Sequence, residues 1–138
     1  MKTILRNIVA VVIGLVTGGI MNMALVVIGP HVIAPPPGVD LTSTQNLSAS
    51  VHLLQPRNFI FPFLAHALGT LVGALAAYLI AAGDRRWFAY GIGFVSLAGG
   101  IAAACMIPAP AWFVTLDLVV AYLPMAWLAT RLGARLRA

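Results

Sequence analysis

Apolar residues fill four long stretches of the chain, and polar residues are concentrated in the segments between them. The stretches cover about 5–29, 59–82, 87–107 and 111–130. Each has about 20 residues or more, which is enough for a helix to cross a hydrocarbon core of roughly 30 Å. Helices satisfy their own backbone groups in lipid, whereas barrel strands would show alternating segments of about 10 residues. The pattern therefore predicts four membrane-spanning helices in one all-α domain, residues 1–138.

The composition favours a membrane protein and excludes several other classes. Hydrophobic residues make up 62% of the chain and charged residues 8%, and the mean hydropathy is +1.01. Soluble domains usually have about a quarter of their residues charged. Cys105 is the only cysteine, which excludes an internal disulfide, a CxxC redox motif and a four-cysteine zinc site. The net charge of +5 does not indicate a nucleic-acid partner, because the basic residues lie at the ends of apolar stretches instead of forming one patch.

The basic residues predict the orientation of the chain in the membrane. Seven of the eight fall on one side of the predicted spans, and Arg57 alone falls on the other. The seven are Lys2, Arg6, Arg85, Arg86, Arg131, Arg135 and Arg137. Since Lys and Arg accumulate in cytoplasmic loops, we expect a multi-pass protein of the cell (inner) membrane with both termini in the cytoplasm. The first stretch is too long for a signal peptide and lacks a small-residue cleavage site, so it counts as a span.

The connections between the stretches predict how the helices are arranged. Residues 83–86 and 108–110 form tight links, and short links place successive helices antiparallel and side by side. We therefore expect an antiparallel four-helix bundle with up-down-up-down topology. Small residues line one face of each stretch, as is typical of helix contacts in membranes. Pro62 and Pro124 are expected to bend their helices, because each removes a backbone hydrogen bond.

The long outer loop, residues 30–57, carries its own helix signal. Thr42 and Gln45 match a capping box, with a hydroxyl acceptor followed three residues later by an amide. Apolar residues then recur at helical spacing, at Leu47, Val51 and Leu54. The pattern predicts a short amphipathic helix at about 43–54 that covers the outer mouth of the bundle, and Pro56 ends it.

Three polar residues within the spans form the candidate site. Asn22, His66 and Asp117 lie on three different helices, each on the small-residue face and each roughly 9–11 Å below the outer interface. Burying an unpaired carboxylate costs at least about 2.5–3.5 kcal/mol, so Asp117 should face inward and contact His66. Ser96 and Thr70 lie deeper than these three, Thr70 by about one turn below His66. These five residues are the predicted ligand-binding set, with no catalytic or metal-ligating residue and no cofactor assigned.

This cluster is compatible with several roles. An Asp–His pair with an amide can bind a small ligand, a lipid head or an ion, and can also serve only to fix the packing of the bundle. Our first hypothesis is a ligand-, lipid- or ion-binding or accessory module, whose partners are the bilayer, a small ligand or ion, and a second copy or a larger membrane complex. The second is a proton-coupled transporter or channel that uses Asp117 and His66. The third, a lipid-modifying enzyme with His66 as base, is disfavoured because no nucleophile or second acid accompanies the pair.

Three segments carry a resemblance to a known group of proteins. They are 61–70 (FPFLAHALGT), 108–113 (PAPAWF) and 117–122 (DLVVAY). In these segments the chain resembles small four-helix bacterial integral membrane proteins that have no assigned activity. The resemblance implies a four-helix membrane fold and carries over no activity. The function hypotheses differ in one observable property, namely whether a cavity at the cluster opens outward, inward or nowhere.

Overall fold

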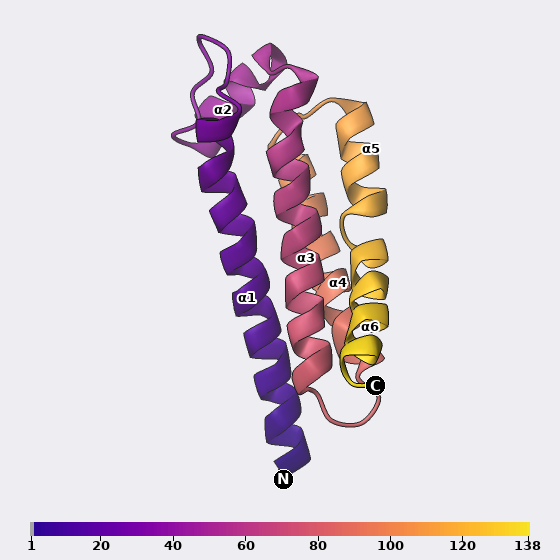
Figure 1. Cartoon of the computed structure of the whole chain (residues 1–138). Coiled ribbons are helices and arrows are strands. Elements are labelled where there is room, and N and C mark those ends of the chain that lie inside the picture. Colours follow the sequence, from indigo (N-terminus) through magenta and orange to yellow (C-terminus); the bar gives the residue numbers. More distant parts are fainter. Residues whose placement is uncertain (1) are drawn as a thin grey trace.

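The computed structural model describes residues 2–138, and all the regular structure in that range is helical. Four helical segments are long and apolar enough to cross a membrane, as the hydropathy pattern predicts: Lys2–Val32, Pro56–Ile80, Arg86–Met106 and Ala111–Leu136. The helices in chain order are α1 (Lys2–Val32), α2 (Thr44–Ser50), α3 (Ile60–Ile80), α4 (Arg86–Met106), α5 (Ala111–Val120) and α6 (Leu123–Leu136), with 3-10 turns η1 (Val51–Leu53) and η2 (Pro56–Phe59) before α3. Figure 1 shows both chain ends toward the lower end of the molecule and α2 at the upper end.

Helix α3 is the centre of the packing. It contacts α1 along most of its length and also contacts α4 and α6, whereas α1 and α4 touch only briefly (Figure 1). Glycines permit the close approach of α1 to α3: a Cβ added at Gly18 would lie 2.7 Å from the backbone oxygen of Gly69. One added at Gly14 would lie 2.8 Å from the oxygen of Gly73. The small-residue faces therefore mark this interface, and backbone contact replaces side-chain interdigitation there.

The fourth span is two helices instead of the one continuous helix predicted over 111–130. Helix α5 ends at Val120 and α6 begins at Leu123, and Tyr122 between them has φ −118° and ψ −81°. Pro124 lies in the first turn of α6, where its missing N–H would have had no intrahelical partner. In a continuous helix the Pro124 ring would clash with the carbonyl of Val120. Pro124 therefore breaks the helix before its own position, where a bend was predicted.

Two predicted helix ends also differ from the structure. Helix α1 continues through Pro30 to Val32, beyond the predicted end at 29, and α6 continues to Leu136. The predicted ends were placed where hydropathy falls. A fall in hydropathy does not end a helix, because the backbone hydrogen bonds of the helix do not depend on apolar side chains. The second and third spans, at Ile60–Ile80 and Arg86–Met106, lie within two residues of their predicted bounds.

The loop over 30–57 carries a short helix at one end of the bundle, which we name the loop end. Helix α2 ends at Ser50 and passes into η1, so it is shorter than the predicted 43–54, and Pro56 begins η2 instead of ending the helix. The cap is Ser43 instead of Thr42: its side chain accepts a hydrogen bond from the Asn46 N–H. The Thr42 hydroxyl donates to Asp40 instead, and this hydrogen bond lowers the pKa of that exposed carboxyl. Leu47 and Leu54 are half-buried, as expected for the apolar stripe.

Two contacts tie this segment to the bundle. Val51 is buried against Phe59 and Phe113, at the starts of α3 and α5, and the Ser48 hydroxyl donates to the backbone oxygen of Met106. The loop end of the bundle is therefore closed by packed side chains.

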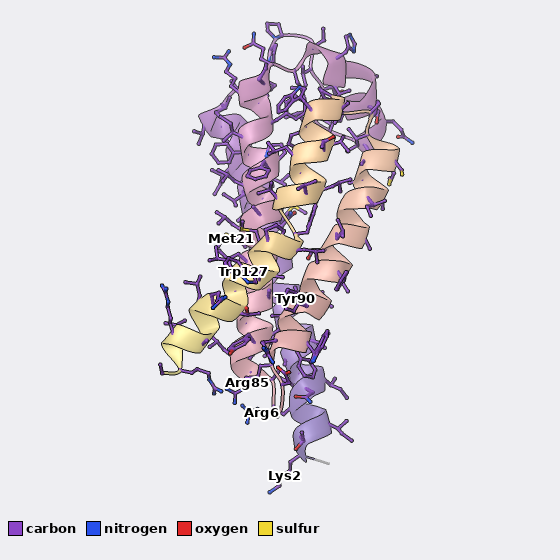
Figure 2. All side chains as sticks on the ribbon, turned by 90° about the vertical axis from the view of Figure 1, so that its right-hand side faces the viewer. Lys2, Arg6, Met21, Arg85, Tyr90 and Trp127 are labelled. Carbon is purple, nitrogen blue, oxygen red and sulfur yellow. The ribbon has the colours of Figure 1, made fainter. Side chains whose placement is uncertain are left out.

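The opposite end carries most of the basic residues, and we name it the basic end. Figure 2 shows Lys2, Arg6 and Arg85 gathered there. The Arg6 guanidinium donates to the backbone oxygen of Ile80, and the Asn7 side-chain oxygen accepts from the Ala82 N–H. These contacts satisfy backbone groups at the end of α3 that lack helical partners.

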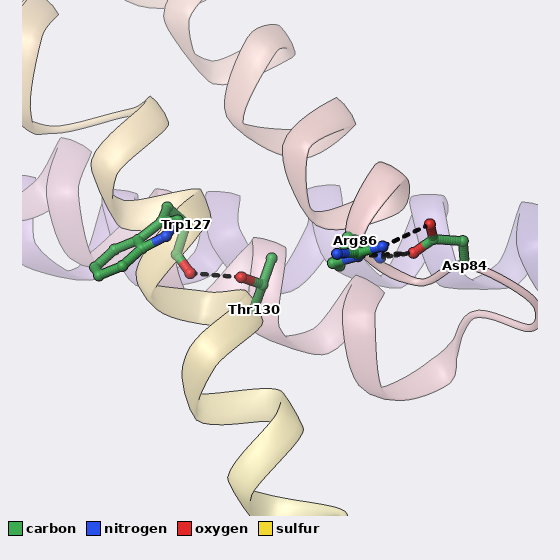
Figure 3. A network of polar contacts seen from close by, with 4 residues as sticks. All are labelled: Asp84, Arg86, Trp127 and Thr130. Atoms are coloured by element: carbon green, nitrogen blue, oxygen red, sulfur yellow. Dashed lines mark hydrogen bonds and ion pairs between the residues drawn. The ribbon is translucent and has the colours of Figure 1, made fainter.

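The turn into α4 and the middle of α6 show more local polar contacts. Figure 3 shows Arg86 paired with Asp84 at 3.1 Å across the turn. This hydrogen bond lowers the pKa of the Asp84 carboxyl, but the pair is exposed, and exposed pairs contribute little to stability. In the same view the Thr130 hydroxyl donates to the backbone oxygen of Trp127 within α6.

Candidate functional site

His66 on α3 and Asp117 on α5 are in direct contact, as predicted from their shared depth. The His66 Nδ1 atom lies 2.9 Å from both carboxylate oxygens of Asp117. The Asp117 side chain is only 6% exposed, whereas that of His66 is 26% exposed. The carboxylate is thus buried behind the imidazole, and it has the partner that its desolvation requires.

Tyr122 is a third member of this cluster that the sequence pattern did not predict. Its hydroxyl donates to Asp117 Oδ2 at 2.9 Å, and its ring stacks on that of His66 with centroids 5.8 Å apart. On a continuous helix, residues five apart point about 140° away from each other. The break between α5 and α6 turns Tyr122 back toward Asp117, so the available sequence signal was Pro124.

The hydrogen-bond pattern determines which atoms of the cluster carry protons. The ionised carboxylate of Asp117 can only accept hydrogen bonds. It accepts one from the Tyr122 hydroxyl and one from the N–H at His66 Nδ1. The imidazole is therefore assigned from this network as protonated at Nδ1. Its Nε2 atom makes no hydrogen bond with any of residues 2–138 and is left for an external partner.

A cavity of about 330 Å³ adjoins His66 and contains the other predicted residues. Asn22 from α1, Thr70 from α3 and Ser96 from α4 line it together with His66 and Tyr122. Asp117 is not part of the wall; it supports the wall from behind through His66 and Tyr122. The structure thus brings the five predicted residues together around one cavity, four of them in its lining.

The hydroxyl groups in this cavity differ from those of three other threonines in the spans. Thr17, Thr115 and Thr130 each donate to a backbone oxygen three or four residues earlier in their own helix. Within the described chain, the hydroxyls of Thr70 and Ser96 make no such bond, and neither does the amide of Asn22. Thr70 as a whole is only 3% exposed, and no side-chain oxygen or nitrogen of residues 2–138 is both fully buried and without a partner. The hydroxyls of Thr70 and Ser96 and the amide of Asn22 are therefore available to a molecule in the cavity.

The cavity opens sideways, between α1 and α4. At its edge lie Leu15 and Gly19 of α1 and Gly99 of α4, and all three are exposed. Toward the basic end the gap closes where Gly14 meets Ile92. The lining comes from α1, α3, α4 and Tyr122, without the 30–57 loop. The opening therefore lies on the side of the predicted spans instead of at either end, a direction that the sequence hypotheses did not include.

The lining is mostly apolar, with polar groups from Asn22, His66, Thr70, Ser96 and Tyr122, and it contains no Lys, Arg, Asp or Glu side chain. Among residues 2–138, His, Cys, Asp and Glu side chains do not gather in groups of three, the smallest number of protein ligands in typical zinc sites. The chemistry on offer is hydrogen bonding from hydroxyl and amide groups, with a basic nitrogen at one side.

Comparison of the chain with known protein families, with curated proteins and with solved structures gives no match.

Proposed function

We propose that this protein is a small membrane-embedded binding module that holds a small molecule in the cavity between α1, α3 and α4. Asn22, Thr70, Ser96 and His66 contact the bound molecule, and Asp117 positions His66. The four spans form an antiparallel up-down-up-down bundle in the cell (inner) membrane. The basic end faces the cytoplasm, so that both termini are cytoplasmic and the 30–57 loop is outside.

The observation that supports this proposal is the set of hydrogen-bonding groups left without protein partners around one cavity. A cluster with a purely structural role would satisfy its members among themselves, as Asp117 and Tyr122 do. Thr70, Ser96 and Asn22 instead present their polar groups to the cavity, whereas three other threonines of the spans donate to backbone oxygens of their own helices. A volume of about 330 Å³ lies at the lower end of the range for small-molecule sites.

We expect Thr70→Val to reduce the amount of a molecule that copurifies with the protein. The substitution keeps the volume and removes one hydrogen bond worth about 1 kcal/mol, so occupancy at limiting ligand should fall roughly fivefold. Molecules released from the purified, denatured protein are measured by untargeted mass spectrometry.

Thr115→Val is the matched control, because the Thr115 hydroxyl is exposed and bonds to the Ala111 oxygen of its own helix. It should leave the amount of the copurified molecule unchanged. A cavity that held water alone would release no molecule whose amount depends on Thr70, and that result would contradict the proposed function.

The broken fourth span favours a second candidate, a proton-coupled transporter. Discontinuous helices with unwound backbone at mid-membrane are typical of transporter binding sites, and here the break at 121–122 lies beside Asp117. For such a transporter we expect liposomes with the wild-type protein to lose an imposed pH gradient faster than liposomes with Asp117→Asn. A pH-sensitive dye trapped inside measures the rate, and equal rates for wild-type and empty liposomes would exclude proton movement.

The orientation has its own test, in a Cys105→Ala background. We expect a membrane-impermeant maleimide added to intact cells to label His52→Cys, which lies exposed in the 30–57 loop. It should not label Asp84→Cys or Leu136→Cys, at the basic end. Labelling of position 84 or 136 from outside would show that the orientation is wrong.

A further inference from the structure

The position of the cavity mouth determines whether a bound molecule enters from water or from the bilayer. Toward the loop end, Val51 of the 30–57 loop packs on Phe59 and Phe113, and the loop contributes no residue to the cavity lining. Toward the basic end, Gly14, Gly73 and Ile92 are in close contact, with a Cβ added at Gly14 falling 3.1 Å from the Ile92 side chain. The exposed edge of the cavity lies on the flank of α1 and α4, at Leu15, Gly19 and Gly99, within the apolar spans. A molecule therefore enters from the bilayer, where lipids are concentrated.

The mouth has room for an apolar chain. A Cβ added at Gly19 or at Gly99 would meet no atom within 4 Å, so the two helices present bare backbone at the entrance. The neighbouring side chains on the same helices, such as Leu15, Val16 and Val95, are apolar and exposed. The cavity itself, at about 330 Å³, accommodates a polar head of a few heavy atoms and leaves the rest of a lipid in the mouth.

The lining also restricts the charge of that head. Lys, Arg, Asp and Glu are absent from the residues that line the cavity, and the Asp117 carboxylate behind it already accepts from both His66 and Tyr122. A phosphate or an ammonium head would therefore lose its hydration without gaining a counter-charge. Hydroxyl and amide groups donate and accept hydrogen bonds, and a hydroxyl-bearing head does the same.

We propose that the cavity binds the head of an uncharged, hydroxyl-bearing lipid of the monoacylglycerol class, which enters sideways between α1 and α4. This inference rests on the proposed function, because it names the class of molecule that the same cavity takes. Asn22, Thr70 and Ser96 hydrogen-bond the head, His66 Nε2 accepts from one of its hydroxyls, and the acyl chain leaves past Gly19 and Gly99.

The test uses a monoacylglycerol with a diazirine near the ester end of its acyl chain. The full-length protein in phosphatidylcholine liposomes is irradiated with this probe, and labelled peptides are mapped by mass spectrometry. We expect labelling to concentrate on α1 around Gly19 and on α4 around Gly99. Excess unlabelled monoolein should abolish it, and a lysophosphatidic acid with the same chain should not compete.

Two variants with matched controls make the result specific. Thr70→Val should reduce the labelling about fivefold, and Thr115→Val should not change it. Gly99→Leu should block the mouth, whereas Gly91→Leu, at an equally open glycine on α4, should not. Labelling spread over the lipid faces of all helices and insensitive to Thr70→Val would overturn the inference, as would equal competition by lysophosphatidic acid.

The outcomes separate this inference from the proposed function. If the molecule that copurifies in a Thr70-dependent amount is water-soluble while the probe does not label the mouth, the protein is a binding module and the lipid inference is wrong. If neither a Thr70-dependent copurified molecule nor mouth labelling is found, both are wrong.

Discussion

Gly18→Ala is expected to lower the free energy of unfolding by about 1–3 kcal/mol, the typical cost of overpacking a close contact. The added Cβ would lie 2.7 Å from the backbone oxygen of Gly69 and 3.3 Å from the Cα of Gly73. Both of these are backbone atoms that cannot rotate away, so α1 has to move off α3. Thermal unfolding of the purified protein in detergent, followed by the loss of helical circular dichroism, measures the change.

Gly19→Ala is the control, because it is the next residue on the same helix and its Cβ would meet no atom within 4 Å. It should leave the unfolding temperature unchanged or raise it slightly, since Ala is a better helix former than Gly by up to about 1 kcal/mol. Equal shifts for the two variants would show that α1 does not depend on close backbone contact with α3.

The spans could be predicted from the sequence because they depend on a property of single stretches, namely enough consecutive apolar residues to cross the bilayer. Their ends were less predictable. Helix α1 runs through Pro30, and the fourth span breaks at 121–122. Both features depend on where the chain can lose a backbone hydrogen bond of the helix, and the hydropathy of the side chains does not indicate those positions.

Some features of the candidate site could also be predicted from the sequence, and others could not. The contact between His66 and Asp117 was predictable, because a buried carboxylate needs a partner and the two residues lie at one depth. Tyr122 was not, because it reaches Asp117 only through the helix break. The sideways opening was not predictable either, since it depends on how far α1 and α4 diverge beyond Gly14 and Ile92.

The break between α5 and α6 also explains how His66 is held in place on one side while its Nε2 atom remains open to the cavity. Asp117 lies near the end of α5 and Tyr122 just before α6, so that the carboxylate contacts His66 Nδ1 while the Tyr122 hydroxyl bonds to the carboxylate and the Tyr122 ring stacks on the imidazole. The other side of the imidazole, with Nε2, is thereby left to the cavity. A continuous helix would have presented Asp117 alone, and the His66 ring would have lost the stacking contact that fixes its plane.

His66→Ala should cause the larger loss of stability at the site itself. It leaves the 6% exposed Asp117 carboxylate with Tyr122 as its remaining partner. Leaving a buried charged acceptor without one of its hydrogen-bond donors typically costs about 1–3 kcal/mol or more. Asp117→Asn removes the charge and keeps the volume, so it should cost less than His66→Ala. The double variant should be more stable than His66→Ala alone, because it contains no stranded carboxylate.

Asp117→Asn should nevertheless impair binding, for a reason that stability alone would not reveal. The amide of Asn can donate to His66 Nδ1, which moves the imidazole proton to Nε2. The nitrogen that faces the cavity then changes from an acceptor to a donor, so the variant should fold and lose the copurified molecule. Tyr122→Phe removes only a donor to the carboxylate, keeps the Nδ1 proton in place, and should retain the molecule. Thermal unfolding and mass spectrometry on the same preparations separate the two effects. If Asp117→Asn keeps its full complement of the molecule while the double-variant cycle shows strong coupling, the His66–Asp117 pair serves stability alone.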